Sequence, residues 1–140
     1  VASYAPPSGL AEWARAVRTP YTAVSAALFH LLWKVTAEKD PRYPCAPDDG
    51  GTDVLRRMLG EVPEASACDG IVPLTSQLYG EPIWIGKGDH LDMVGHFPGP
   101  GGHTDWMASG ARFDIARFET IMERIVEGML AAQNAPRRPS

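Results

Sequence analysis

The sequence lacks a long apolar run and an excess of positive charge. Its longest apolar stretch, Tyr21 to Trp33, is interrupted by a histidine and polar residues and is too short to span a bilayer. Thirteen lysines and arginines stand against seventeen aspartates and glutamates, and the basic residues form no stripe interleaved with aromatic residues. The sequence therefore predicts no transmembrane helix here and no nucleic-acid partner, since a nucleic-acid-binding protein needs a basic surface.

Cysteine is also scarce, and the two cysteines, Cys45 and Cys68, do not form a spacing typical of a metal site. A disulfide between them would close a loop of about 23 residues and stabilise the fold by about 3 kcal/mol. The sequence leaves this pairing open. The chain begins "VASYAPPSG", with no basic segment before an apolar core, so we expect no signal peptide in it.

What the sequence does contain is an ordinary globular composition, 44% hydrophobic and 21% charged over 140 residues. A domain of this length buries about two thirds of the surface that its unfolded chain exposes. Thr52 is expected to cap a short helix that Gly60 closes. The patterns predict a strand end over residues 1–5, helices over 10–18, 22–38 and 53–59, a short buried strand Ile83–Ile85, and a long final helix.

Two of the predicted helices have clear apolar faces. In the helix over residues 22–38 one stripe comprises Val24, Leu28, Leu31, Leu32 and Val35, with Phe29 and Trp33 beside it. In the final helix the apolar positions are Phe118, Ile121, Met122, Ile125, Val126 and Met129. The first stripe is wider than a simple surface helix needs, and core packing is one of the accounts open for it. We expect the final helix to pack flat on a sheet.

The expected organisation has three parts. Residues 1–61 form a strand end and a helical, cap-like region. Residues 62–133 carry two loops, the strand between them and the final helix, and residues 134–140 form a disordered tail. Two short strands cannot form an independent sheet, so either the pattern misses strands or the sheet's other strands lie in sequence absent here.

Two polar loops flank the strand Ile83–Ile85. "DGIVPLTSQLYG", residues 69–80, precedes it, and "GDHLDMVGHF", residues 88–97, follows it. Loops at the carboxyl ends of neighbouring parallel strands lie side by side, so Asp69 can orient His90, and His90 can act as the base that activates a nucleophile. The order acid then base matches the last two members of a triad whose nucleophile comes first.

Each of these residues also has a simpler interpretation. Asp before Gly is a common turn pair, because Asp bonds its own backbone and Gly tolerates positive φ. His90 can equally be a loop histidine that bonds to Asp89 or Asp92.

The two loops together resemble the acid loop and the histidine loop of bacterial triacylglycerol lipases and esterases of the α/β-hydrolase superfamily. "HTDWMASGARFD" and the final helix resemble the tail of such proteins. The resemblance covers residues 62–131 well and residues 1–61 loosely. It implies an α/β fold, the C-terminal portion of an α/β-hydrolase, with few short parallel strands, a helical cap and a long C-terminal helix.

The resemblance also implies the chemistry. Asp69 is the triad acid, His90 is the base, an ester or lipid is the substrate, the helix over residues 22–35 is a lid or core helix, and such proteins are often secreted. Calcium near Asp92, with Asp48 or Asp49 as a second carboxylate, is a further implication. No serine lies in Gly-x-Ser-x-Gly, so we expect the nucleophile upstream of Val1 or on another chain, and no ester hydrolysis by this chain alone.

A second hypothesis is a metal-binding or non-catalytic module built on loop 89–105. The residue types there suit a divalent metal, although their spacing repeats no known ligand signature. The residues concerned are Asp89, His90, Asp92, His96, His103 and Asp105. A third hypothesis is a self-standing fold whose exposed strand edges are covered by forming a homo-oligomer.

Overall fold

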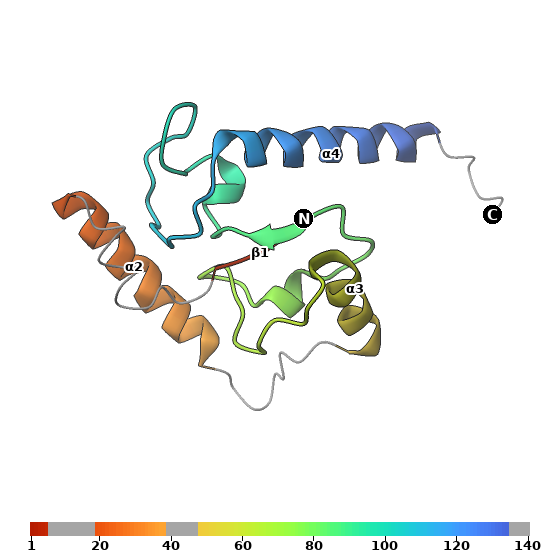
Figure 1. Cartoon of the computed structure of the whole chain (residues 1–140), viewed down its shortest axis with the longest axis horizontal. Helices are drawn as coiled ribbons and strands as arrows, with labels where there is room; N and C mark the ends of the chain where they lie inside the picture. The colour runs from red at the N-terminus through yellow and green to blue at the C-terminus, as the bar shows by residue number, and fades with distance from the viewer. Residues whose placement is uncertain (6–18, 39–47, 135–140) are drawn as a thin grey trace.

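Residues 1–5, 19–38 and 48–134 are described by the structure, a computed structural model of the chain (Figure 1). Helices dominate, and the two strands are short. In chain order the elements are strand β1 (Ala2–Tyr4), helices α2 (Pro20–Ala37) and α3 (Asp49–Leu59), the 3-10 turn η1 (Leu74–Gln77), strand β2 (Ile85–Lys87), the 3-10 turn η2 (Asp92–Val94) and helix α4 (Ile115–Asn134).

Strands β1 and β2 pair in parallel, although α2, α3 and η1 come between them in the sequence. Ala2 lies opposite Ile85 and Tyr4 lies opposite Lys87. The α/β class is confirmed at this coarse level. The predicted strand Ile83–Ile85 is wrong by two residues, because pairing with β1 rather than local β propensity decides where the strand forms.

Side chains occupy the outer edges of this strand pair. On β1, the backbone N–H of Ser3 donates to Gln77 Oε1 at 2.9 Å, and Gln77 Nε2 donates to the Ser3 carbonyl at 3.0 Å. On β2, the Arg117 guanidinium donates to the Lys87 carbonyl at 3.2 Å. Backbone groups that an adjoining strand would otherwise pair are therefore satisfied by side chains.

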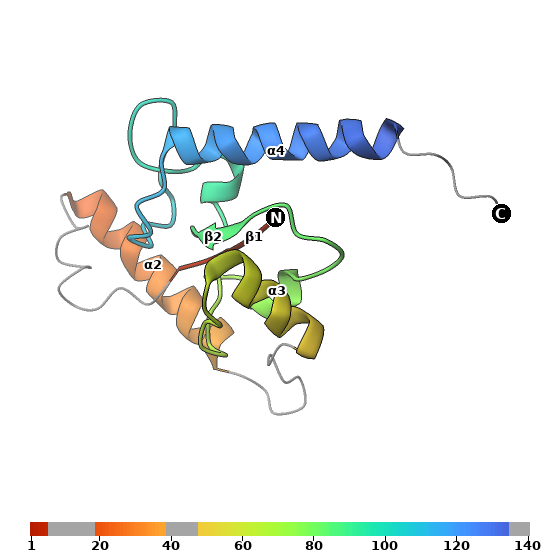
Figure 2. The same cartoon turned by 45° about the vertical axis from the view of Figure 1, so that its right-hand side comes forward.

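Helices cover both sides of the strand pair. In both views α4 lies on one side of the strands and α3 on the other (Figures 1 and 2). Leu55 of α3 packs with Tyr4 and Ile85 in one buried cluster. Ile121 of α4 packs with Phe97 in another. The core is thus divided into small clusters around a very small sheet.

Helix α2 presents to the core a face other than its apolar stripe. Phe29 is only 1% exposed, and Ser25 is also buried. Ser25 Oγ donates to the Asp105 carbonyl at 3.0 Å, and Thr36 Oγ1 donates to the Gly70 carbonyl at 3.1 Å. The inner face therefore carries hydroxyl groups that satisfy loop carbonyls, and an apolar periodicity does not detect such a face.

The predicted apolar stripe of α2 is mostly exposed. Leu32 alone among its members packs against a buried cluster. The exposed members are Val24, Leu28, Leu31 and Val35, the first of them 71% exposed. Core packing, one of the two accounts open for this helix face, is therefore wrong for most of the stripe.

Helix α4 does not pack flat on a sheet, which corrects a second expectation. Strands of three residues are about 10 Å long, whereas a helix of 20 residues is about 30 Å long. The helix instead packs through Ile121 on Phe97 and Phe113, which come from loops. Val126 and Met129, in its C-terminal half, are exposed.

The helix ends show which capping predictions hold. Helix α3 begins at Asp49 and is capped by Asp48, whose Oδ1 accepts from Gly51 N at 2.7 Å, so the predicted cap Thr52 lies inside the helix. Asp48 takes this role because its carboxylate reaches the first free N–H groups one turn earlier. Gly60 ends α3 in a left-handed conformation, as predicted.

Several expectations fall on residues that the structure does not describe. The predicted helix over residues 10–18 and the tail after residue 134 lie outside the described residues. Cys45 does too, so the structure does not test its pairing with Cys68. Among the residues described, no helix has both the length and the apolar character needed to cross a membrane.

The orientation of α2 can be tested with one pair of substitutions. Phe29→Ala should lower the free energy of unfolding by about 3–5 kcal/mol, because it empties a buried position. Leu31→Ala, on the exposed stripe, should change it by no more than about 0.5 kcal/mol. Urea unfolding measures both, and a larger loss in Leu31→Ala than in Phe29→Ala would show that the helix faces the core the other way.

Candidate active site

Asp69 is held in a tight turn after Cys68. Its carboxylate is buried, with 2% of the residue exposed. Oδ1 accepts from the backbone N–H of Ile71 at 2.9 Å and of Val72 at 2.7 Å, and the Asp69 N–H donates to the Val72 carbonyl at 3.2 Å. These bonds replace the water that the buried carboxylate has lost and fix the direction in which Oδ2 points.

Gly70 makes this turn sterically feasible. Its φ is +96°, in the left-handed region that favours glycine. A Cβ added here would lie 2.7 Å from Met107 Cε and 2.9 Å from Phe29 Cε2. The turn thus packs closely against α2 and the loop around Met107, and it has no room for a larger residue.

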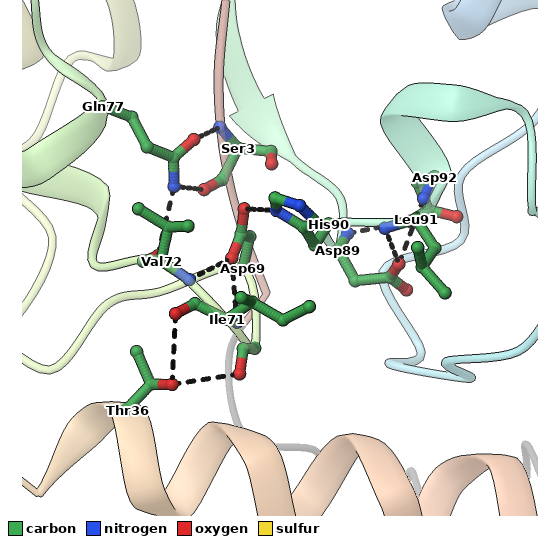
Figure 3. Close-up of polar contacts among 11 residues, drawn as sticks. Ser3, Thr36, Asp69, Ile71, Val72, Gln77, Asp89, His90, Leu91 and Asp92 are labelled. Carbon is green, nitrogen blue, oxygen red and sulfur yellow. Dashed lines mark hydrogen bonds and ion pairs between the residues drawn. The ribbon is translucent and has the colours of Figure 1, made fainter.

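His90 reaches Asp69 from the loop that follows β2. Its backbone N–H donates to the Asp69 carbonyl at 2.9 Å, and its Nδ1 lies 2.8 Å from Asp69 Oδ2 (Figure 3). The imidazole side chain is 44% exposed, whereas the Asp69 side chain is 3% exposed. A carboxylate only accepts, so Nδ1 is assigned as the donor, which leaves Nε2 as the basic nitrogen.

The two residues that the sequence predicts to act together therefore meet. The acid turn lies at the carboxyl end of β1, where Ala5 N donates to the Cys68 carbonyl at 2.9 Å. The histidine loop begins at the carboxyl end of β2, where Gly88 N donates to the Tyr4 carbonyl at 3.0 Å. A buried acid that orients a partly exposed imidazole is an arrangement suited to general base chemistry.

The alternative partners of His90 bond to each other instead. Asp89 Oδ1 accepts from the N–H groups of Leu91 and Asp92 at 3.0 and 3.1 Å, and Asp92 Oδ2 accepts from Asp89 N at 2.8 Å. Both residues are buried. This pair begins η2 and turns the chain directly after His90, so its contribution to the site is structural.

Burial raises the pKa of both carboxyl groups of this pair. Desolvation raises the pKa of Asp89 to about 6. Desolvation and the neighbouring charge of Asp89 raise the pKa of Asp92 to about 9. Desolvation also raises the pKa of Asp105, against the lowering effect of a hydrogen bond from Met107 N and of nearby His96. Like charges held close in a poorly solvated place favour the protonated form.

The resemblance implies a calcium ion near Asp92, a member of this carboxyl pair. Across residues 1–5, 19–38 and 48–134, no group of three or more histidine, cysteine, aspartate or glutamate side chains is placed to hold a metal ion. Asp92 Oδ2 already accepts the Asp89 N–H. Calcium binding near Asp92 stays a prediction from the resemblance.

The other histidines, all within the described residues, make no hydrogen bond to Asp69 or His90, the pair called the dyad below. His30 is exposed on α2. His96 Nδ1 lies 2.9 Å from the Thr104 carbonyl, and its ring lies 5.5 Å from the ring of His103. These contacts hold loop 95–104 together and supply no group to the Asp69 carboxylate.

One polar neighbour of the acid turn was not predicted. Gln77 bonds to both Ser3 and Val72, and Val72 bonds to Asp69 (Figure 3). A glutamine eight residues after an aspartate matches no sequence motif, so the sequence does not predict this contact. Only the folding of η1 back onto β1 reveals this link.

Comparison with known proteins adds no relative. A scan against protein-family models, a search of curated proteins and a search of solved structures each gave no match. The assignment of chemistry to this chain therefore depends on its own geometry.

The crowding at Gly70 gives a measurable difference between two glycines. Gly70→Ala should lower the free energy of unfolding by about 2–4 kcal/mol through left-handed strain and overpacking. Gly80→Ala is the control, since Gly80 has φ +71° with nothing within 4 Å of its added Cβ. It should cost about 1 kcal/mol. Equal losses in urea unfolding would contradict the close packing at Gly70.

The raised pKa values predict how stability depends on pH. Asp89 and Asp92 bind protons more tightly in the folded chain than at their ordinary value of 3.8. Their contribution to stability is therefore complete below that value and is lost as pH rises through about 6 and about 9. Asp92→Asn, a neutral isostere, should reduce this loss and be more stable than the parent at pH 9.

Urea unfolding at pH 5, 7 and 9 measures this dependence. Asp114→Asn is the control, because Asp114 is an exposed carboxylate at the start of α4. Identical pH slopes for the parent and Asp92→Asn would contradict the buried carboxyl pair.

Proposed function

We propose that this chain supplies the acid and the base of a serine carboxylic-ester hydrolase. The observation that carries the proposal is the 2.8 Å contact between Asp69 Oδ2 and His90 Nδ1, with the other carboxylate oxygen held by two backbone N–H groups. A fixed, buried acid behind a partly exposed imidazole is the relation that a Ser-His-Asp triad requires.

The roles follow from the geometry. Asp69 holds His90 in the tautomer whose Nε2 is basic and stabilises the imidazolium that forms. His90 removes the proton from a serine hydroxyl as the hydroxyl attacks the ester carbonyl. It then gives that proton to the leaving alcohol.

The serine comes, in this proposal, from outside these 140 residues or from another chain. No serine here lies in Gly-x-Ser-x-Gly. Ser3, drawn near the dyad in Figure 3, belongs to β1 and is 1% exposed, so an ester cannot reach its hydroxyl. Ser25 and Ser109 are buried too.

The same proposal covers the finer fold and the cap. The chain corresponds to the C-terminal portion of an α/β-hydrolase, with β1 and β2 as two of its parallel strands. In support, the acid turn lies beside the carboxyl end of β1 and the base follows the carboxyl end of β2, the side of a parallel sheet where open α/β folds bind their ligands. The exposed stripe of α2 is apolar, as a helix over an acyl pocket would be.

Ester hydrolysis tests the proposal directly. The purified 140-residue chain should show no steady turnover of p-nitrophenyl butyrate. The same chain expressed with the coding sequence upstream of Val1 should show turnover, which His90→Ala should abolish. Asp69→Asn should reduce kcat by about 10⁴-fold, because the histidine loses its tautomer.

The matched control is His30→Ala, which removes an exposed histidine from α2 and should leave turnover unchanged. Turnover by the 140-residue chain alone, lost in His90→Ala, would contradict the need for an outside serine. An upstream sequence without Gly-x-Ser-x-Gly, and without activity, would contradict the hydrolase itself.

A further inference from the structure

The side-chain amide of Gln77 connects strand β1 to the acid turn. Its Oε1 accepts from Ser3 N at 2.9 Å, and its Nε2 donates to the Ser3 carbonyl at 3.0 Å and to the Val72 carbonyl at 3.2 Å (Figure 3). Both amide protons and the amide oxygen are therefore used. Ser3 is buried, so its backbone groups have no access to water in place of Gln77.

Val72 is the point at which this connection reaches Asp69. The Val72 N–H donates to Asp69 Oδ1 at 2.7 Å, which is shorter than the 2.9 Å bond from Ile71 N. The Val72 carbonyl accepts from both Asp69 N and Gln77 Nε2. A rotation of the Val72 backbone would therefore weaken the hydrogen bond from Val72 N to the Asp69 carboxylate.

The other end of the connection leads toward His90. Ser3 belongs to β1, and the carbonyl of the next residue, Tyr4, accepts from Gly88 N at 3.0 Å. Gly88 lies two residues before His90. Gln77 thus bridges the turn that holds the acid and the strand pair that delivers the base.

We infer that Gln77 is a positioning residue for the Asp69 and His90 dyad, acting through the Val72 N–H. A role of Gln77 in catalysis rests on the proposed function. Its effect on the contact between Asp69 and His90 can be measured whether or not the chain is a hydrolase. Gln77 touches neither dyad side chain in any hydrogen bond of the described residues.

Backbone bonds that do not involve Gln77 set the size of the effect. Ala5 N donates to the Cys68 carbonyl at 2.9 Å, and His90 N donates to the Asp69 carbonyl at 2.9 Å. These keep the acid turn near β1 when Gln77 is replaced. Loss of Gln77 should therefore loosen the Asp69 carboxylate without detaching the turn.

The measurement is the proton on His90 Nδ1, observed by NMR in the whole 140-residue chain and identified by its loss in His90→Gln. Gln77→Leu should move this resonance upfield and speed its exchange with water about tenfold, as expected for weakening one hydrogen bond to a charged group. Gln77→Glu keeps the length and the acceptor but has no N–H for Val72, so it should behave as Gln77→Leu does.

Two control variants separate positioning from general stability. Ser76→Ala removes an exposed neighbour in η1 and should leave the resonance unchanged. Ile121→Val weakens a different buried cluster, that of Phe97 and Phe113. The two variants are compared at urea concentrations that leave them equally stable. If Gln77 acted on stability alone, Ile121→Val would then accelerate exchange of the His90 Nδ1 proton as much as Gln77→Leu does.

Each result decides something. Parent-like exchange in Gln77→Leu or in Gln77→Glu overturns the role of the Val72 bond, and absence of the resonance in the parent overturns the dyad and its positioning together. The resonance can respond to Gln77 substitution while the chain, expressed with its upstream sequence, shows no esterase activity. That result would contradict the proposed function and leave the positioning role intact.

Discussion

The buried carboxylate of Asp69 is the constraint on which the candidate site depends. A carboxylate enters a protein interior only where hydrogen bonds replace its water, and here two backbone N–H groups and one imidazole do so. The left-handed Gly70 and the close approach of Phe29 follow from this requirement, because the chain must turn sharply to bring those N–H groups round. The same bonds that make burial tolerable also aim the acid at His90.

The histidine loop also buries carboxyl groups, and these bond to backbone N–H groups of the loop itself. Asp89 and Asp92 are buried beside each other, so desolvation raises the pKa of both carboxyl groups, and the charge of Asp89 raises that of Asp92 further. Each also accepts backbone N–H groups, so the pair shapes the turn after His90. One acid in this small region is therefore positioned to orient a base, while its neighbours serve mainly to shape the backbone.

The surroundings of the site are held by loops and helices more than by a sheet. Gln77 and Arg117 occupy the outer edges of the two strands. Helices α2 and α4 each leave apolar side chains exposed, Val24 and Leu31 on one and Met129 on the other. Small buried clusters of this kind leave the placement of each loop dependent on a few specific hydrogen bonds, which is why a side chain such as Gln77 has influence over the dyad.

The sequence by itself determined the presence of helices α2, α3 and α4, the left-handed end of α3 at Gly60, and the meeting of Asp69 with His90. The first two depend on apolar spacing and glycine conformation, and the third depends on two polar loops placed on either side of one strand. The sequence misplaced β2 by two residues, since strand pairing with β1 is a long-range choice. It did not identify the inner face of α2, because the buried Ser25 and the half-buried Thr36 face inward to bond to loop carbonyls. Only the tertiary structure decided the link through Gln77 and the raised pKa of Asp92, since the first joins distant segments and the second arises from burial on folding.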